Sequence, residues 1–459
     1  MLPEEFLSRM KSYLEGDEYE AFLSSYNDIP NRSLRINRLK KSSGGKTPEG
    51  TLSLILKDRV AWCDNGYYYD EDDRPGRHAY HEAGLYYIQE ASAMAPVEWL
   101  DVRPGMKVLD LCAAPGGKST EIAGAMENKG LLITNEPETD RARILSLNIE
   151  RSSVGNALVT SEMPDRLSGR FEGFFDRILV DAPCSGEGMF RKNPDAVNEW
   201  SSANVSYCAE RQTGILREAA KMLFPGGIMV YSTCTFSKDE NEEMIESFLK
   251  ENNGFSPVDP DTVKRLPEGF IKTEYGVRIY PHKVRGEGHF FSILKREGDV
   301  PGEIKRLSSN GALDRASNAD IKLFNDFAHE SLPDLILPEG MIHTFGEQLY
   351  LAPEDCPGLR GLKVLRPGLH LGTLKNKRFE PSHALALFIS PDEAVLNAEI
   401  NGSPDLALKY MRGETLPADI INGNGRKGWC IVSVDGYSIG WGKSDGRIIK
   451  NHYPRGLRI

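Results

Sequence analysis

Strand-like and helix-like segments alternate between residues 84 and 295, and this alternation limits the possible folds more than any other feature of the sequence. Short apolar runs typical of buried strands stand at 106–112 (MKVLDLC), 130–136 (GLLITNE) and 228–234 (IMVYSTC). Segments such as 138–152 (ETDRARILSLNIERS) lie between them and carry apolar residues at helical spacing. This order predicts an α/β domain with a doubly wound, mostly parallel, Rossmann-like sheet.

The two ends of the chain do not follow this alternation. A chain of 459 residues is too long for one hydrophobic core, so about two to four domains are expected. Residues 1–72 have a helical and then a mixed pattern, which indicates a small N-terminal domain. After residue 298, short strand-like pieces broken by glycine and proline predict one or two small mixed or β-rich modules.

The seven cysteines are odd in number and scattered, with no CxxC pair and no histidine spacing typical of a metal site. They therefore predict neither a disulfide framework nor a zinc centre. No apolar run approaches the roughly 18–20 residues that a membrane helix needs. The acidic, amphipathic N-terminus does not resemble a secretory signal. We expect a cytoplasmic protein without a metal ion or a membrane span.

The distribution of charge is more informative than the net charge of −11. Three segments are rich in lysine and arginine and poor in acids: 31–41, 359–379 and 440–459. Each could be an ordinary solvated face. Three such segments on an acidic chain favour a surface that binds the backbone of a polyanion such as RNA.

The segment 108–120 (VLDLCAAPGGKST) passes from a buried strand through a turn of small residues into a helix. Ala113, Ala114, Gly116 and Gly117 would let a ligand approach the backbone, and the helix N-terminus offers free N–H groups. The segment has neither the GxGxxG spacing nor the Walker spacing of phosphate-binding loops. Glu136 ends the next strand, where such folds place the carboxylate that binds ribose hydroxyls. The alternative is a turn needed only for packing, but the pattern favours a nucleoside ligand without pyrophosphate, such as S-adenosylmethionine.

Two cysteines follow two strand-like runs, Cys184 in DAPCSGEGMF and Cys234 in YSTCT. If the two strands are neighbours, both thiols and Asp181 face one pocket at the carboxyl ends of the strands. A methyl donor alone needs no thiol, whereas carbon 5 of a pyrimidine becomes nucleophilic once a thiolate adds to carbon 6. A single cysteine is more often a small buried hydrophobe. Two of them beside an aspartate favour covalent catalysis.

The sequence resembles the RNA (cytosine-5) methyltransferases of the Sun/NSUN type, and it is most similar to their bacterial 16S ribosomal RNA branch, called RsmF. The resemblance covers nearly the whole chain and is strongest in six segments: RSLRINRLK (32–40), YYIQEASAMAP (86–96), DLCAAPGGKST (110–120), FDRILVDAPCSGEGMFRK (175–192), GGIMVYSTCTFSKDENE (226–242) and GEGHFFSILKR (286–296). The combination of DAPCSGEG with YSTCT is highly specific.

The resemblance implies roles for individual residues. Cys234 corresponds to the nucleophile of the family, Cys184 to the cysteine that assists release of the product, and Asp181 to the residue that contacts the ring nitrogen of cytosine. Glu162 is the candidate for the acid that faces the adenine, although the stretch SEMPD departs from the pattern of many relatives. The implied cofactor-binding residues are Ala113, Ala114, Pro115, Gly116, Gly117, Lys118, Glu136, Arg141, Glu162 and Asp181.

The resemblance also implies a division of the chain. It assigns an N-terminal RNA-binding domain to 1–72, the methyltransferase domain to 73–298, an RsmF-type middle module to 299–388 and a PUA-like RNA-binding module to 389–459. Aromatic residues among the basic residues of the tail, namely Trp429, Tyr437, Trp441 and Tyr453, suit stacking on RNA bases. The alternative, which we favour for Trp429, is that they form the core of a small β-barrel.

Together these features predict transfer of a methyl group from S-adenosylmethionine to carbon 5 of cytosine in RNA. Only the tail favours 16S ribosomal RNA or the small ribosomal subunit as the partner, and a monomer is expected. A transfer RNA methyltransferase of the same mechanism remains an alternative. A catalytically silent RNA-binding assembly factor on the same fold is a second alternative, although the intact cysteines, Asp181 and the cofactor turn argue against it.

Overall fold

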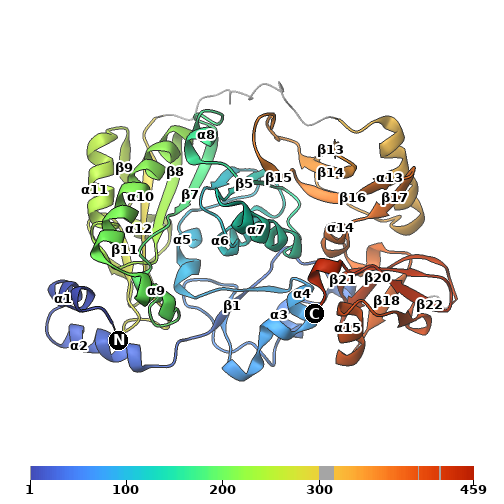
Figure 1. The fold of residues 1–459 in the computed structure, drawn as a ribbon, viewed down its shortest axis with the longest axis horizontal. Helices are drawn as coiled ribbons and strands as arrows, with labels where there is room; N and C mark the ends of the chain where they lie inside the picture. Colours follow the sequence, from blue (N-terminus) through green and yellow to red (C-terminus); the bar gives the residue numbers. More distant parts are fainter. Residues whose placement is uncertain (1, 299–314, 402, 423–424) are drawn as a thin grey trace.

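The computed structural model describes residues 2–298, 315–401, 403–422 and 425–459 (Figure 1). Its largest sheet has ten strands in the order β10-β11-β12-β8-β7-β4-β5-β6-β15, with β9 paired to β12. These strands are β4 (Lys107–Asp110), β5 (Leu131–Asn135), β6 (Ala157–Thr160), β7 (Phe175–Asp181), β8 (Leu223–Thr233), β9 (Phe255–Pro257), β10 (Ile271–Lys272), β11 (Val277–Ile279), β12 (His289–Arg296) and β15 (Val364–Arg366). The five central strands from β6 to β8 are parallel, which confirms the predicted Rossmann-like sheet.

Helices cover both faces of this sheet. The main ones are α5 (Ala95–Glu98), α6 (Gly117–Met126), α7 (Thr139–Arg151), α8 (Pro164–Ser168), α9 (Pro194–Glu199), α10 (Ser202–Met222), α11 (Glu242–Glu251) and α12 (Pro260–Val263). Successive residues of a strand point to opposite faces. Val108 therefore lies in a core with α6 and α7, whereas Leu109 lies in a second core with α8, α10 and α11.

The N-terminal residues split between two parts of the molecule. Helices α1 (Glu4–Tyr13) and α2 (Asp17–Ser24) place Phe6 and Phe22 in a core with Trp200 and Phe236 of the part that contains the large sheet. Strands β1 (Ser33–Ile36), β2 (Gly66–Tyr68) and β3 (Tyr86–Ile88) form a separate sheet, and their core extends into the C-terminal residues. Short helices α3 (Pro48–Thr51) and α4 (Ala79–Glu82) accompany this sheet. Because β3 lies beyond residue 72, the sheet crosses the boundary expected there.

Two small sheets follow the large one. The first has the order β13-β14-β16-β17 and the second has the order β18-β20-β21-β22-β19, which confirms the mixed and β-rich character expected for the tail. The elements are α13 (Asn318–Ser331), β13 (Gly340–Phe345), β14 (Gln348–Pro353), β16 (Leu369–Lys375), β17 (Arg378–Pro381), α14 (His383–Phe388), β18 (Asn397–Ile400), α15 (Pro404–Met411), β19 (Leu416–Pro417), β20 (Gly428–Val434), β21 (Tyr437–Ser444) and β22 (Ile448–Asn451). The expected boundary at residue 299 lies outside the described residues.

The aromatic residues of the tail are mostly part of its core. Tyr437, Trp441 and Tyr453 are buried, so the idea that they stack on RNA is wrong for these three side chains. Trp429 is only half-buried and packs against Trp441, with the ammonium of Lys443 4.9 Å from the centre of its ring. Within the described residues, none of the helices combines the length and apolar character that crossing a membrane would take.

Candidate active site

The carboxyl ends of β4, β5, β7 and β8 open into a crevice of about 430 Å³. Parallel strands of this topology place their ligand sites at this edge of the sheet. The crevice is lined by six of the residues singled out from the sequence: Ala114, Glu136, Arg141, Asp181, Cys184 and Cys234. The structure therefore brings the expected cofactor side and the two thiols together in one cavity.

The turn between β4 and α6 is held by helix α7. Gly116 has φ 115°, and a Cβ atom there would lie 3.1 Å from a side-chain methyl of Leu145, so this position requires glycine. Asn148 of α7 donates a hydrogen bond to the carbonyl of Pro115 (2.7 Å), and Arg141 donates one to the carbonyl of Ala114 (3.1 Å). The backbone from Ala113 to Lys118 is thus fixed before any ligand binds.

Glu136 follows β5 directly and its side chain is buried. One carboxylate oxygen accepts a hydrogen bond from the backbone N–H of Glu138 (3.1 Å), and the other lies 3.4 Å from the guanidinium of Arg141. Glu136 lines the crevice, and a carboxylate is a natural acceptor for the two hydroxyls of a ribose. The carboxylate of Glu136 and the close-packed glycine turn beside it together fit a nucleoside ligand.

Glu162 and Asp165 differ in their surroundings. The carboxylate of Glu162 accepts a hydrogen bond from the backbone N–H of Lys363 (2.6 Å), and Glu162 does not line the crevice. Met163 and Asp165, from the same SEMPD stretch, do line it. The role of Glu162 towards the adenine stays a prediction, and Asp165 is the carboxylate of this stretch that faces the cavity.

The two thiols are in contact. Strands β7 and β8 are adjacent and parallel, with Asp181 opposite Ser232, which confirms the predicted neighbourhood of the strands. The sulfur atoms of Cys184 and Cys234 lie 3.3 Å apart, and the backbone N–H of Cys234 also approaches the Cys184 sulfur at 3.3 Å. The hydrogen bond with Cys234, together with burial, raises the pKa of Cys184. Cys184 is therefore a protonated thiol beside a second sulfur.

Asp181 is a part-buried carboxylate, with 31% of its side chain exposed, that is held in its charged form. Burial raises its pKa, but Lys118 at 2.7 Å and the hydroxyl of Ser232 at 2.8 Å outweigh this effect, and the pKa of Asp181 is lowered overall. The pKa of Lys118 is raised, because its attraction to Asp181 outweighs the effect of burial. This ion pair links α6, on the cofactor side, to β7, on the thiol side.

Helix α10 contributes a wall of the crevice that the sequence did not reveal. Arg211, Gly214, Ile215 and Glu218 line the cavity from this helix. Their spacing of three and four residues places them on one helical face. That spacing was the available signal, but a helix face that mixes charged and non-polar residues is equally typical of ordinary packing at the protein surface.

One further group of side chains has the composition of a metal site. Atoms of Cys63, Glu98 and Glu121 lie within 4.8 Å of one another. Arg35 lies 3.6 Å from Glu121, and Lys264 lies 2.5 Å from Glu98. Each carboxylate thus already has a cationic partner, and the cluster is explained as part of the packing between α5, α6 and the turn that precedes β2.

Sequence profiles of four families match consecutive parts of the chain. The profile described as "N-terminal domain of 16S rRNA methyltransferase RsmF" matches residues 2–91, and the one described as "16S rRNA methyltransferase RsmB/F" matches residues 97–295. The "RsmF rRNA methyltransferase first C-terminal domain" matches residues 326–389, and the "Methyltransferase RsmF PUA domain" matches residues 398–459.

Solved structures share the fold of the larger part of the chain. A methyltransferase homologue from Pyrococcus horikoshii superimposes with a TM-score of 0.54 and 26% identity, over 64% of this chain and 95% of that one. NSun6 from the same organism, solved with SFG, has a TM-score of 0.55 over 65% of this chain and 99% of that one. Its identity of 21% supports a shared fold only.

Curated relatives extend over the whole chain. Ribosomal RNA small subunit methyltransferase F of Aliivibrio salmonicida is 32% identical over 471 residues, which cover 99% of this chain and 97% of that protein. The protein of the same name from Aeromonas hydrophila is 33% identical over 478 residues, with the same coverage. Identity at this level over both full lengths, together with the four profiles, shows that the chain belongs to the RsmF family of methyltransferases.

Proposed function

We propose that this protein transfers a methyl group from S-adenosylmethionine to carbon 5 of a cytosine in 16S ribosomal RNA, through a covalent bond between Cys234 and carbon 6 of the base. The observation that carries the proposal is the contact of two thiols, 3.3 Å apart, beside an ionised aspartate in the crevice that also contains Glu136. The names of the full-length relatives support ribosomal RNA of the small subunit as the substrate.

S-adenosylmethionine is the cofactor of this methyltransferase, and when bound it supplies an electrophilic methyl group on a sulfonium. Glu136 would accept hydrogen bonds from the ribose hydroxyls, and Arg141 keeps its carboxylate oriented. The backbone of the turn from Ala113 to Lys118 would lie against the ligand. We also propose that Asp165 or Glu162 closes the adenine end of the site.

Asp181 would bind the polar edge of cytosine. As a carboxylate it accepts hydrogen bonds from the amino group and from a protonated ring nitrogen of the base. Holding that proton on the ring withdraws electrons from carbon 6 and favours attack there. Lys118 keeps Asp181 ionised and in place, since it donates the shortest bond to it.

The two cysteines would divide the remaining steps. The thiolate of Cys234 adds to carbon 6, and the resulting enamine makes carbon 5 nucleophilic enough to take the methyl group. A base then removes the proton from carbon 5, and the bond between Cys234 and carbon 6 breaks. Cys184, which is protonated and in contact with Cys234, would give its proton to the departing sulfur and regain one from water.

RNA would bind through exposed basic residues and through the module that matches the PUA family. Lys375, Lys377 and Arg378 are exposed at the hairpin between β16 and β17. In the first basic segment, by contrast, Arg35 and Lys40 are buried and hold protein groups, so they are not available to RNA. We therefore propose that residues 1–72 bind RNA through the basic side chains of the segment 31–41 that stay exposed. That the protein acts as a monomer and without a metal ion remains a prediction.

A denaturing gel with labelled RNA tests the roles of the cysteines. Cys234→Ala removes the nucleophile, so methylation should fall to background with no covalent band. Cys184→Ala should still attack and methylate, and should then remain attached to the RNA. A covalent band that persists in Cys234→Ala would contradict the proposal.

Bisulfite sequencing of ribosomal and transfer RNA from a deletion strain separates the alternatives. Loss of 5-methylcytosine from 16S ribosomal RNA is the expected result. Loss from transfer RNA alone would identify a transfer RNA enzyme, and no loss from either would favour an RNA-binding assembly factor.

A further inference from the structure

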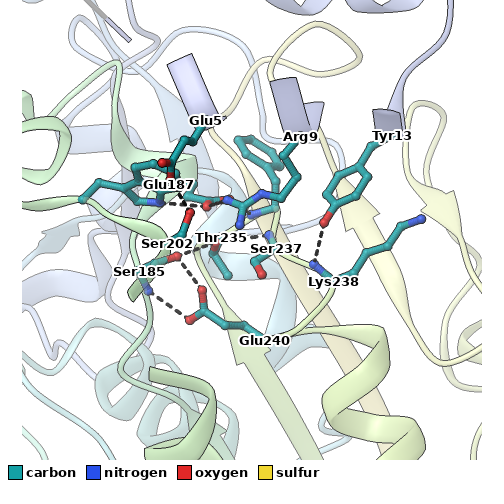
Figure 2. Close-up of polar contacts among 12 residues, drawn as sticks. Glu5, Arg9, Tyr13, Ser185, Glu187, Ser202, Thr235, Ser237, Lys238 and Glu240 are labelled. Atoms are coloured by element: carbon teal, nitrogen blue, oxygen red, sulfur yellow. Dashed lines mark hydrogen bonds and ion pairs between the residues drawn. The ribbon is translucent and has the colours of Figure 1, made fainter. Parts of the chain in front are cut away.

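Each of the two loops that carry the cysteines is hydrogen-bonded to a glutamate carboxylate from the other loop. Glu187, three residues after Cys184, accepts a hydrogen bond from the backbone N–H of Phe236, in the loop of Cys234 (3.1 Å). In return Glu240, from the loop of Cys234, accepts one from the backbone N–H of Ser185 (3.0 Å). Figure 2 shows the carboxylate of Glu240 reaching Ser185 from the opposite side to Glu187. We call this reciprocal pair, Glu187 and Glu240 with their backbone partners, the clasp.

Both carboxylates of the clasp are fully buried, with relative exposures of 0%. Each accepts a further hydrogen bond from a buried side chain, Glu187 from the indole of Trp200 (2.9 Å) and Glu240 from the amide of Gln212 (2.9 Å). Burial raises the pKa of Glu240. Burying a carboxylate is costly unless its hydrogen bonds are satisfied, so both side chains depend on the donors that the two loops and their neighbours supply.

The clasp is formed close to the two cysteines along the chain. Its two backbone donors, Ser185 and Phe236, are one and two residues from the cysteines of their loops. Two more bonds tie the same loops, one from the backbone N–H of Gly188 to the carbonyl of Cys234 (2.8 Å) and one between the hydroxyls of Ser185 and Thr235 (2.8 Å). The separation of the two thiols is therefore fixed by bonds between the loops and not by the strands alone.

Helix α1 completes this arrangement from a distant part of the sequence. Arg9 forms an ion pair with Glu187, and Figure 2 shows its guanidinium pointing into the clasp. Phe6 and Met10 of the same helix lie in a core with Phe190, Trp200 and Phe236. The helix thus covers the clasp and supplies the cation that balances Glu187.

We propose that Glu187 and Glu240 are positioning residues for the release step, and that Arg9 supports them from α1. This rests on the covalent mechanism proposed above. Attack on the base needs the sulfur of Cys234 alone, whereas release needs the thiol of Cys184 in contact with that sulfur. Loosening the clasp should therefore slow release more than it slows attack and methyl transfer.

The test uses the full-length variants Glu187→Gln, Glu240→Gln and Arg9→Met. Glutamine keeps the size of the side chain but has one oxygen, which cannot serve all the donors that the carboxylate serves. On a denaturing gel, the lifetime of the protein–RNA conjugate should rise about ten- to a hundredfold, the penalty expected when reacting groups shift by about 1 Å. Single-turnover methyl transfer should change far less than this lifetime.

Glu150→Gln is the matched control, because Glu150 forms a buried ion pair with Arg366 far from the cysteine loops. It should lower the melting temperature without lengthening the conjugate lifetime. Conjugate lifetimes equal to that of the unmodified protein in all three clasp variants would overturn the proposal. If one buried variant fails to fold, Arg9→Met still decides, since Arg9 lies at the edge of the network, partly exposed.

A second readout does not depend on the reaction. Iodoacetamide labelling of Cys184 across pH reports the pKa of this thiol, which the contact with Cys234 raises. In the clasp variants the labelling profile of Cys184 should move to lower pH, and an unchanged profile would contradict the clasp. If Cys184→Ala forms no conjugate at all, the covalent mechanism is wrong. The labelling experiment then still tests whether the clasp positions Cys184.

Discussion

The cofactor half and the thiol half of the crevice are built in opposite ways. The cofactor half is one continuous piece of sequence from β4 to Glu136, and its central contacts come from adjoining elements such as α7. The thiol half is assembled from α1, the loops after β7 and β8, and α10, with the partners Arg9 and Glu187 separated by 178 residues. The first half therefore depends on local sequence, and the second depends on the folding of the whole chain.

Lys118 belongs to both halves, so its replacement should have the largest effect. Lys118→Met leaves Asp181 as a part-buried carboxylate without its lysine partner and should destabilise the fold by about 2–3 kcal/mol at neutral pH. Urea denaturation at several pH values measures this loss. Lys250→Met, which breaks the exposed pair with Glu246, is the control and should leave the stability almost unchanged.

The loss should depend on pH in a defined direction. The pKa of Asp181 is lowered in the folded protein, so the pair contributes stability above the unfolded pKa of about 3.9 and loses it as the pH falls through the folded pKa. The pKa of Lys118 is raised, so the contribution is lost again as the pH rises through that value. An equal deficit at pH 2 and at pH 7 would argue against the ion pair as the cause.

Glu136→Ala should affect the cofactor half alone. Loss of the charged acceptor should weaken the binding of S-adenosylmethionine by about 1.5–3 kcal/mol, measured by calorimetry. Iodoacetamide labelling of the two thiols should stay unchanged. Glu138→Ala, at an exposed position two residues on, provides the control. A change in thiol labelling would show that the two halves are not independent.

The basic hairpin between β16 and β17 lies outside both halves. Replacing Lys375, Lys377 and Arg378 by glutamine should weaken RNA binding about tenfold and lower the log–log salt slope by roughly one unit for each phosphate that the protein no longer binds. Cofactor binding should not change. Neutralising exposed Lys129 and Lys250 serves as the control for charge alone. If affinity and slope both stay the same, the hairpin is a solvated face.

The smallest effect should separate the two carboxylates of the SEMPD stretch. Asp165→Ala should weaken cofactor binding by about 0.5–1 kcal/mol, because it removes one hydrogen-bond acceptor from the crevice. Glu162→Ala should leave affinity unchanged, since its carboxylate is engaged with the backbone of Lys363. The opposite ranking in calorimetry would restore Glu162 as the residue that faces the adenine.

The sequence predicted the local fold of the cofactor half, from β4 through the glycine turn to the strand end at Glu136, because these features are local. A strand ending in a glycine turn, followed by a helix and an acidic strand end, needs no information from elsewhere in the chain. A shared pocket for Cys184 and Cys234 was also predicted, on the condition that their two strands are neighbours, and the structure adds that the two sulfur atoms are in contact. In both cases a residue at the end of a strand has only one edge of the sheet to face.

The remaining features depend on packing between distant segments. Nothing in the sequence around Arg9 indicates that it pairs with Glu187, and Glu240 reads as one of several acids at a helix start. Arg35 and Lys40 look like solvated charges until the fold buries them. Trp441 stands two residues before Lys443 in a segment rich in basic residues, yet its ring is buried in the core of its module.

The strand β15 has a consequence for the integrity of the whole molecule. It comes from the segment after β14, yet it pairs antiparallel with β6 and so becomes the last strand of the large sheet. An uncovered β6 would offer a row of unpaired backbone groups, which is a template for pairing with another chain. The tail therefore covers the edge of the sheet and protects it against aggregation. Removing the tail from the methyltransferase part would expose the unpaired backbone groups of β6, and it would also remove a module that contributes to RNA binding.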